Sequence, residues 1–130
     1  MFDEVLHCAR VLLDSRHPVL AAMATRDVTA DRIEFRGWTT HIEHIKAYHD
    51  VDLALDPFPH TGGVTALEGL WHGVPPVTLL GERVPERLSA SFCSALNLRF
   101  CVTSTRAQYI ETAAALATEA SFRPRLADIR

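Results

Sequence analysis

Apolar residues recur along this chain at two different spacings. Near the start, Val5, Leu6, Ala9 and Leu12 fall at the 3.6-residue period of an amphipathic helix. The same kind of spacing, together with flanking cap residues, predicts helices at residues 3–15, 40–49, 64–72, 85–96 and 105–119, with a final helical turn or two at 122–129. Short apolar runs bounded by turn residues predict strands at residues 32–35, 51–55, 74–80 and 100–102.

One segment fits both patterns. The run PVLAAMA at residues 18–24 suits either a short buried strand or a turn of helix, and we interpret it as a strand. From residue 32 onward, strands and helices alternate, which predicts a parallel sheet with helices on both faces. We therefore expect one Rossmann-like α/β domain spanning residues 1–130. In the helices we expect Ile42, Ile45 and Tyr48, and then Leu67, Leu70 and Trp71, to face the core.

Composition narrows the range of partners. The chain has 130 residues, 48% of them hydrophobic and 22% charged, with a formal net charge of −3. This balance is typical of a globular domain and gives no basic surface for nucleic acid or anionic lipid. No apolar run approaches the roughly 18 residues of a membrane span, and MFDEVLHCAR lacks the basic start of a signal peptide. The three cysteines have no CxxC spacing, so we expect reduced, packed thiols in a cytoplasmic protein.

The loop with the clearest chemistry is DPFPHTGGVTALEGLW, at residues 56–71. In an open parallel sheet, ligands bind beyond the carboxyl ends of the strands. Gly62 and Gly63 let a ligand approach the main chain, and the following helix N-terminus favours an anion such as a diphosphate. Thr65 adds a hydroxyl, and Glu68 lies where a carboxylate can accept hydrogen bonds from a ribose diol. Taken alone, a Gly-Gly pair before a helix is more often an ordinary tight turn.

Histidines mark a second candidate. His41 and His44 lie three residues apart near the start of the helix predicted at 40–49. A metal site would need a third ligand, so surface or ligand-contacting histidines are the better interpretation. No DxD pair is present to hold a divalent ion against a nucleotide. Arg87 is either an anion-binding arginine or a solvated one, and Trp38 either stacks on a base or packs.

Residues 32–82 resemble the C-terminal catalytic segment of the O-GlcNAc transferase family, including its bacterial and SPINDLY-like members. The resemblance rests on ALDPFP, a Gly-Gly-x-Thr turn, ExLW and GVPxVTLxGE in that order. It continues more loosely through residues 83–98 to about residue 117. It implies the C-terminal half of a GT-B glycosyltransferase. Such enzymes transfer GlcNAc from UDP-GlcNAc to Ser or Thr of proteins without a metal, so we expect no cofactor.

The resemblance also implies roles for individual residues. Gly62, Gly63, Val64 and Thr65 would surround the diphosphate, and Glu68 would bind the ribose. The segment Trp38, Thr39 and Thr40 would contact the uracil, His41 and His44 would lie near the nucleotide, and Arg87 matches a retained arginine. Val64 departs from the usual hydroxyl residue, and His41 stands where animal enzymes have a lysine.

Other elements of the family have no counterpart in this sequence. We find no match to its catalytic lysine loop, its N-terminal catalytic domain or the tetratricopeptide repeats that hold the protein acceptor. We therefore expect donor binding, with transfer only when a missing or separate domain completes the cleft. The alternatives are a non-catalytic GT-B remnant acting as a binding module, and a transferase that uses GDP-fucose or UDP-glucose. An uncovered interdomain surface would also favour self-association.

Overall fold

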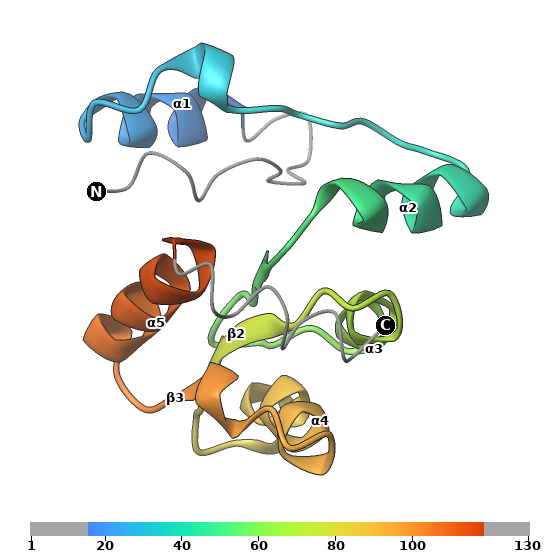
Figure 1. The fold of residues 1–130 in the computed structure, drawn as a ribbon. Helices are drawn as coiled ribbons and strands as arrows, with labels where there is room; N and C mark the ends of the chain where they lie inside the picture. The colour runs from blue at the N-terminus through green and yellow to red at the C-terminus, as the bar shows by residue number, and fades with distance from the viewer. Residues whose placement is uncertain (1–15, 119–130) are drawn as a thin grey trace.

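The computed structural model describes residues 16–118, and a parallel sheet lies at the centre of this part (Figure 1). Its strands are β1 (Ala54–Leu55), β2 (Pro76–Leu79) and β3 (Val102–Thr103), in the order β1-β2-β3. Ala54 pairs with Pro76, and Thr78 pairs with Val102. The predicted strands at 51–55 and 74–80 are thus confirmed in shorter form. The strand predicted at 100–102 is displaced, because Phe100 and Cys101 lie in a 3₁₀ turn and β3 begins only at Val102.

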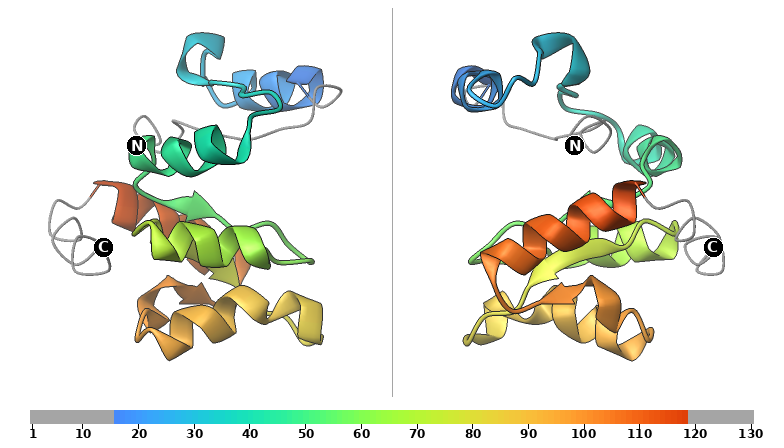
Figure 2. Two further views of the ribbon diagram at one scale, coloured as in Figure 1. Left: turned by 90° about the vertical axis from the view of Figure 1, so that its right-hand side faces the viewer. Right: turned by 60° about the vertical axis from the view of Figure 1, so that its left-hand side comes forward.

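Helices cover both faces of this sheet, as predicted. The crossover helices α3 (Val64–Trp71) and α4 (Leu88–Ala95) lie on one face, and α5 (Arg106–Thr118) lies on the other (Figure 2). Because crossovers between parallel strands are right-handed and the strand order advances in one direction, α3 and α4 must share a face. The short 3₁₀ turns η4 (Val84–Glu86) and η5 (Arg99–Cys101) lead into α4 and β3.

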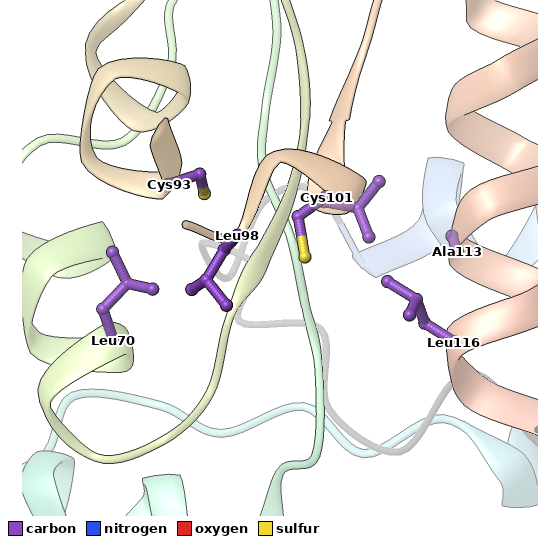
Figure 3. Close-up of a cluster of buried hydrophobic side chains, with 7 residues drawn as sticks. Leu70, Cys93, Leu98, Cys101, Ala113 and Leu116 are labelled. Atoms are coloured by element: carbon purple, nitrogen blue, oxygen red, sulfur yellow. The ribbon is translucent and has the colours of Figure 1, made fainter. Parts of the chain in front are cut away.

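The core lies between the sheet and these helices. Its buried residues come from every layer and are Leu70, Val77, Cys93, Leu98, Cys101, Ala113 and Leu116 (Figure 3). The two thiols in it are free and buried, as expected for packed cysteines. Burial raises the pKa of Cys93 to about 11 and that of Cys101 to about 12, so both remain protonated near neutral pH.

The N-terminal part is built differently. It contains α1 (Arg16–Ala24), η2 (Ala30–Arg32), α2 (His41–Ala47) and η3 (Tyr48–Asp50), and in Figure 1 α1 stands apart from the sheet. The strand interpretation of residues 18–24 is wrong, because this run forms most of α1. The strand predicted at 32–35 is also not formed, since Arg32 ends η2 and residues 33–35 after it are not part of a strand.

Two predicted helix faces also need correction. On α2, Ile42 is 67% exposed rather than packed in the core. On α3, Leu70 is buried as expected, but Leu67 and Trp71 are exposed, and the packed face consists of Ala66, Gly69 and Leu70. A Cβ at Gly69 would lie 3.0 Å from the Val74 carbonyl, so the close approach of the chain at this glycine sets the buried face.

The ends of α3 and α4 follow local chemistry. Gly73 follows α3 with a φ of 75°, a left-handed conformation that glycine adopts readily at the end of a helix. The helix predicted from residue 85 begins instead at Leu88, because Val84–Glu86 form the separate turn η4. The helices predicted at 3–15 and 122–129 lie outside the described residues.

Candidate functional site

The first turn of α3 presents backbone donors that have no partner among the described residues. Gly63 is the N-cap of α3, with φ −106° and ψ −99°, and no side chain caps the helix there. Within residues 16–118, the amide N–H groups of Gly63, Val64 and Thr65 have no hydrogen-bond acceptor. The space beside Gly63 is open, because a Cβ built there would meet nothing within 4 Å. This arrangement suits an anion, since free amides and the positive end of the helix dipole point the same way.

The loop before α3 is fixed from the inside by a buried carboxylate. Asp56, which directly follows β1, is 4% exposed. Its Oδ1 accepts the Gly62 N–H at 2.8 Å, and its Oδ2 accepts the Thr78 hydroxyl at 2.6 Å. The charge of Asp56 also adds to the effect of burial in raising the pKa of Tyr109 to about 12. Sequence reasoning missed Asp56, although a carboxylate between a strand and a Gly-Gly turn is a usable signal.

A second set of contacts fixes the loop from the η4–α4 side. The Ser89 hydroxyl donates to the Gly62 carbonyl at 3.0 Å. The Thr61 N–H and hydroxyl both donate to the Pro85 carbonyl, at 3.1 Å and 2.9 Å. The turn preceding α3 is therefore held on two sides before any ligand arrives.

Further along α3, the predicted ribose-binding carboxylate meets the predicted nucleotide-facing histidine. Glu68 Oε2 lies 3.2 Å from His44 Nε2, and both side chains are partly buried. The Tyr48 hydroxyl donates to the Thr65 carbonyl at 3.1 Å and lies 3.5 Å from His44 Nε2. The ring of Tyr48 stacks on His72. Tyr48, predicted only as a core residue, thus links α2 to α3.

The segment before α2 is exposed at Trp38 and Thr40 and half-buried at Thr39. Trp38 is 86% exposed, and His41 is also exposed. In the described part of the chain, neither makes a hydrogen bond or ion pair with α3. Thr40 is the N-cap of α2 and forms a capping box with Glu43. The structure therefore unites His44, Glu68 and Thr65, while the predicted uracil-contacting loop makes no such polar contact with them.

Arg87 directly follows η4 in the chain. It is the N-cap residue of α4, its side chain is exposed, and its Nη1 donates to the Gly81 carbonyl at 3.0 Å. Beside it, the Glu86 carboxylate accepts the N–H groups of Glu82 and Arg83. These bonds hold residues 81–87 in a compact turn, and Arg87 lies at the end of this turn.

Residues 16–118 contain neither a candidate metal cluster nor a candidate membrane span. In this part of the chain, no three His, Cys, Asp or Glu side chains are grouped so that they could hold a metal ion. None of its helices combines the length and apolar character that crossing a membrane would require.

Comparison with known proteins decides the family. Residues 3–129 match the protein family described as Glycosyl transferase family 41. The chain belongs to glycosyl transferase family 41. Among curated relatives, a probable UDP-N-acetylglucosamine–peptide N-acetylglucosaminyltransferase SPINDLY of Petunia hybrida is 35% identical over 59% of this chain. A UDP-N-acetylglucosamine–peptide N-acetylglucosaminyltransferase of Caenorhabditis elegans is 32% identical over 73% of it.

A solved structure agrees with the family 41 assignment. A mutant O-GlcNAc transferase of Thermobaculum terrenum superposes with a TM-score of 0.83 and 29% identity over 92% of this chain. The resemblance to O-GlcNAc transferases and the predicted fold class are thereby confirmed. The chain spans 24% of that structure's chain and 8% of each of these two curated relatives, so it corresponds to a small part of such an enzyme.

Proposed function

We propose that this chain is the donor-binding part of a protein O-linked N-acetylglucosaminyltransferase and that it holds UDP-GlcNAc. The observation that carries the proposal is the start of α3, where the N–H groups of Gly63, Val64 and Thr65 have no acceptor within residues 16–118. A diphosphate provides several anionic oxygens for such donors. Membership of family 41 supports a nucleotide-sugar as the source of that diphosphate.

The other predicted residues would each contact a different part of the donor. Glu68 would accept hydrogen bonds from the ribose hydroxyls, with His44 beside it at 3.2 Å. Trp38, Thr39, Thr40 and His41 would lie toward the uracil, and Arg87 would contribute positive charge from the rim of the loop. Since the amides and the helix dipole supply the favourable field for phosphate, we propose binding without a metal or other cofactor.

Transfer requires more than donor binding. A Ser or Thr hydroxyl of the acceptor protein must lie in line with the anomeric carbon, and the departing diphosphate must be stabilised. This chain would supply part of the second requirement through α3. We propose that a further catalytic domain, in the same or a separate chain, supplies the acceptor site and that nucleic acid takes no part.

Two further points belong to the same proposal. The free buried thiols of Cys93 and Cys101 support a reducing, cytoplasmic location. Self-association is also proposed, because Val64, Leu67 and Trp71 expose an apolar stripe along α3. Sedimentation at increasing concentration tests the latter, and a monomer throughout would rule it out.

Calorimetric titration of the purified chain tests the donor site. UDP, GDP and UDP-GlcNAc are titrated separately in buffer containing a metal chelator. We expect UDP and UDP-GlcNAc to bind and GDP to bind less tightly. Glu68→Ala and Thr65→Ala should weaken UDP binding, whereas Glu111→Ala, an exposed carboxylate on the opposite-face helix α5, serves as a matched control and should not.

The contrary results are distinct. Binding of GDP in preference to UDP would replace UDP-GlcNAc by another donor such as GDP-fucose. Tighter binding of UDP when Mg²⁺ replaces the chelator, in the wild type and in every variant, would contradict binding without a metal. Absence of binding to any nucleotide would refute donor binding and favour a non-catalytic remnant of the fold.

A further inference from the structure

A buried carboxylate lies directly beneath the amides that the proposed function assigns to the diphosphate. Asp56 is 4% exposed, and each of its oxygens has a defined partner. Oδ2 is bound by Thr78, a fully buried residue of the central strand β2. Oδ1 is bound by the N–H of Gly62, the residue immediately before the N-cap of α3. A single side chain thus connects the rigid centre of the sheet with the start of the helix.

Its own backbone is equally fixed. The Asp56 N–H donates to the Val77 carbonyl at 3.0 Å, and the Asp56 carbonyl accepts the Tyr109 hydroxyl at 3.0 Å. The carboxylate is therefore anchored from β2 and α5 before it reaches the loop. A side chain held in this way has little freedom to move with the loop. The position of the loop is therefore set by the carboxylate.

The Gly62 contact has a directional consequence. Asp56 binds the Gly62 N–H, and Ser89 binds the Gly62 carbonyl, so the peptide groups on both sides of Gly62 have fixed orientations. This orientation sets the direction of the next three amides, those of Gly63, Val64 and Thr65. None of them has an acceptor within residues 16–118. There is also little room for change, because a Cβ at Gly62 would lie 3.1 Å from Asp56 Oδ1.

We infer that Asp56 is a positioning residue for the donor diphosphate, acting through the Gly62 amide without touching the ligand. The inference rests on the proposed function, because it needs the diphosphate at the start of α3. It gives the same loop two separate roles. Asp56 orients the backbone amides, and the amides of Gly63, Val64 and Thr65 bind the phosphates. Loss of Asp56 should then weaken binding of the diphosphate and leave the contacts to the nucleoside unchanged.

The test compares UDP with uridine on the full chain. Affinities are measured by NMR titration for the wild type, Asp56→Ala, Asp56→Asn and Thr78→Val. Asn is the conservative variant, since its carbonyl oxygen can still accept the Gly62 N–H while its amide donates to Thr78. Thr78→Val is the matched control for stability, because it removes the buried partner at Oδ2 and keeps the bond at Oδ1.

The expected pattern is specific to positioning. Asp56→Ala should weaken UDP binding about tenfold or more, because the amides of the loop lose the one or two hydrogen bonds that orient them. Asp56→Asn and Thr78→Val should stay within about threefold of the wild type. Uridine affinity should be the same in all four proteins. Amide exchange at Gly62, measured without ligand, should become fast in Asp56→Ala alone.

Other outcomes overturn the inference in recognisable ways. A folded Asp56→Ala that binds UDP like the wild type would refute it and leave the proposed function intact. A parallel loss of UDP and uridine binding would show a general structural role instead. A wild type that binds no UDP would refute the proposed function, and the inference with it. Should Asp56→Ala fail to fold, Asp56→Ser, which retains a partner for Thr78 and is too short for Gly62, takes its place under the same criteria.

Discussion

The two regions of this molecule are stabilised by different interactions. Among residues 18–53, Val28 alone is buried, and neither α2 nor η3 contains a buried residue. Residues 54–118 hold the sheet and the whole core cluster around Val77. The proposed donor site lies where these regions meet, since His44 and Tyr48 contact α3. Burial therefore fixes the side of the site proposed for the diphosphate, whereas capping and a few polar contacts position the side proposed for the nucleoside.

The largest expected difference between the regions is in the cost of truncating an apolar side chain. Leu70→Ala, in the core at 3% exposure, should lower the free energy of unfolding by about 2–5 kcal/mol. Ile42→Ala, on α2 at 67% exposure, should change it by no more than about 0.5 kcal/mol. Urea denaturation followed by circular dichroism measures both. Similar losses in the two variants would contradict the comparison.

A pair of tyrosines tests the junction between the regions. Tyr48→Phe removes the hydroxyl that binds the Thr65 carbonyl, and Tyr109→Phe removes the one that binds the Asp56 carbonyl. Each should cost about 1 kcal/mol, the usual net value of one hydrogen bond. Hydrogen exchange should separate them, because only Tyr48→Phe should accelerate exchange of the α2 amides. Equal acceleration of α2 by both variants would mean that Tyr48 does not hold this helix.

The N-cap of α2 tests whether local capping, rather than burial, stabilises this helix. Thr40→Ala removes the hydroxyl that accepts the Glu43 N–H, and a lost N-cap costs about 1 kcal/mol of helix stability. Because α2 has no buried face, we expect the loss to appear as local fraying in hydrogen exchange rather than in global unfolding. Thr118→Ala, on α5, is the control and should leave α2 unchanged. Unaltered exchange in α2 after Thr40→Ala would show that other contacts hold its first turn.

The smallest expected effect is a pH dependence at this cap. Hydrogen bonds from the backbone and side chain of Thr40 lower the pKa of Glu43 below its ordinary 4.5. A depressed pKa in the folded state stabilises the fold above pH 4.5, and this contribution is lost as pH falls through the lowered value. Glu43→Gln should therefore be slightly less stable than the wild type at neutral pH and equally stable in acid. A stability difference independent of pH would refute this.

Secondary structure was predicted more accurately from the sequence for residues 54–118 than for the N-terminal region, and the difference has a physical cause. Residues 64–72 and 74–80 carry their own signals, namely helical spacing, Gly73 as a stop and a compact apolar run. A strand at 32–35 requires a neighbour to complete its hydrogen bonds, and a single sequence does not reveal whether one is adjacent. Residues 18–24 are short and apolar, and such runs suit helix and strand equally.

The candidate site shows a similar division. The Gly-Gly turn and Glu68 could be found from motif and spacing, and their roles as ligand contacts stay predictions. The contacts of Tyr48 with Thr65 and of Asp56 with Thr78 could not be assigned from the sequence, because the partners are distant along the chain and are brought near by the fold. The exposed face of α3 was also misjudged, since periodicity does not reveal that Gly69 sits against Val74.

If the amides at the start of α3, which have no acceptor within residues 16–118, bind the proposed ligand, the stability of the fold becomes a measure of ligand occupancy. An anion bound there would be held by the folded chain alone, because the unfolded chain has no helix end to offer. Mass action then adds about 2.7 kcal/mol of stability when the free ligand is at 100 times its dissociation constant. The melting temperature of this small domain would thus rise with nucleotide concentration, so that heat resistance would report how much donor the solution contains.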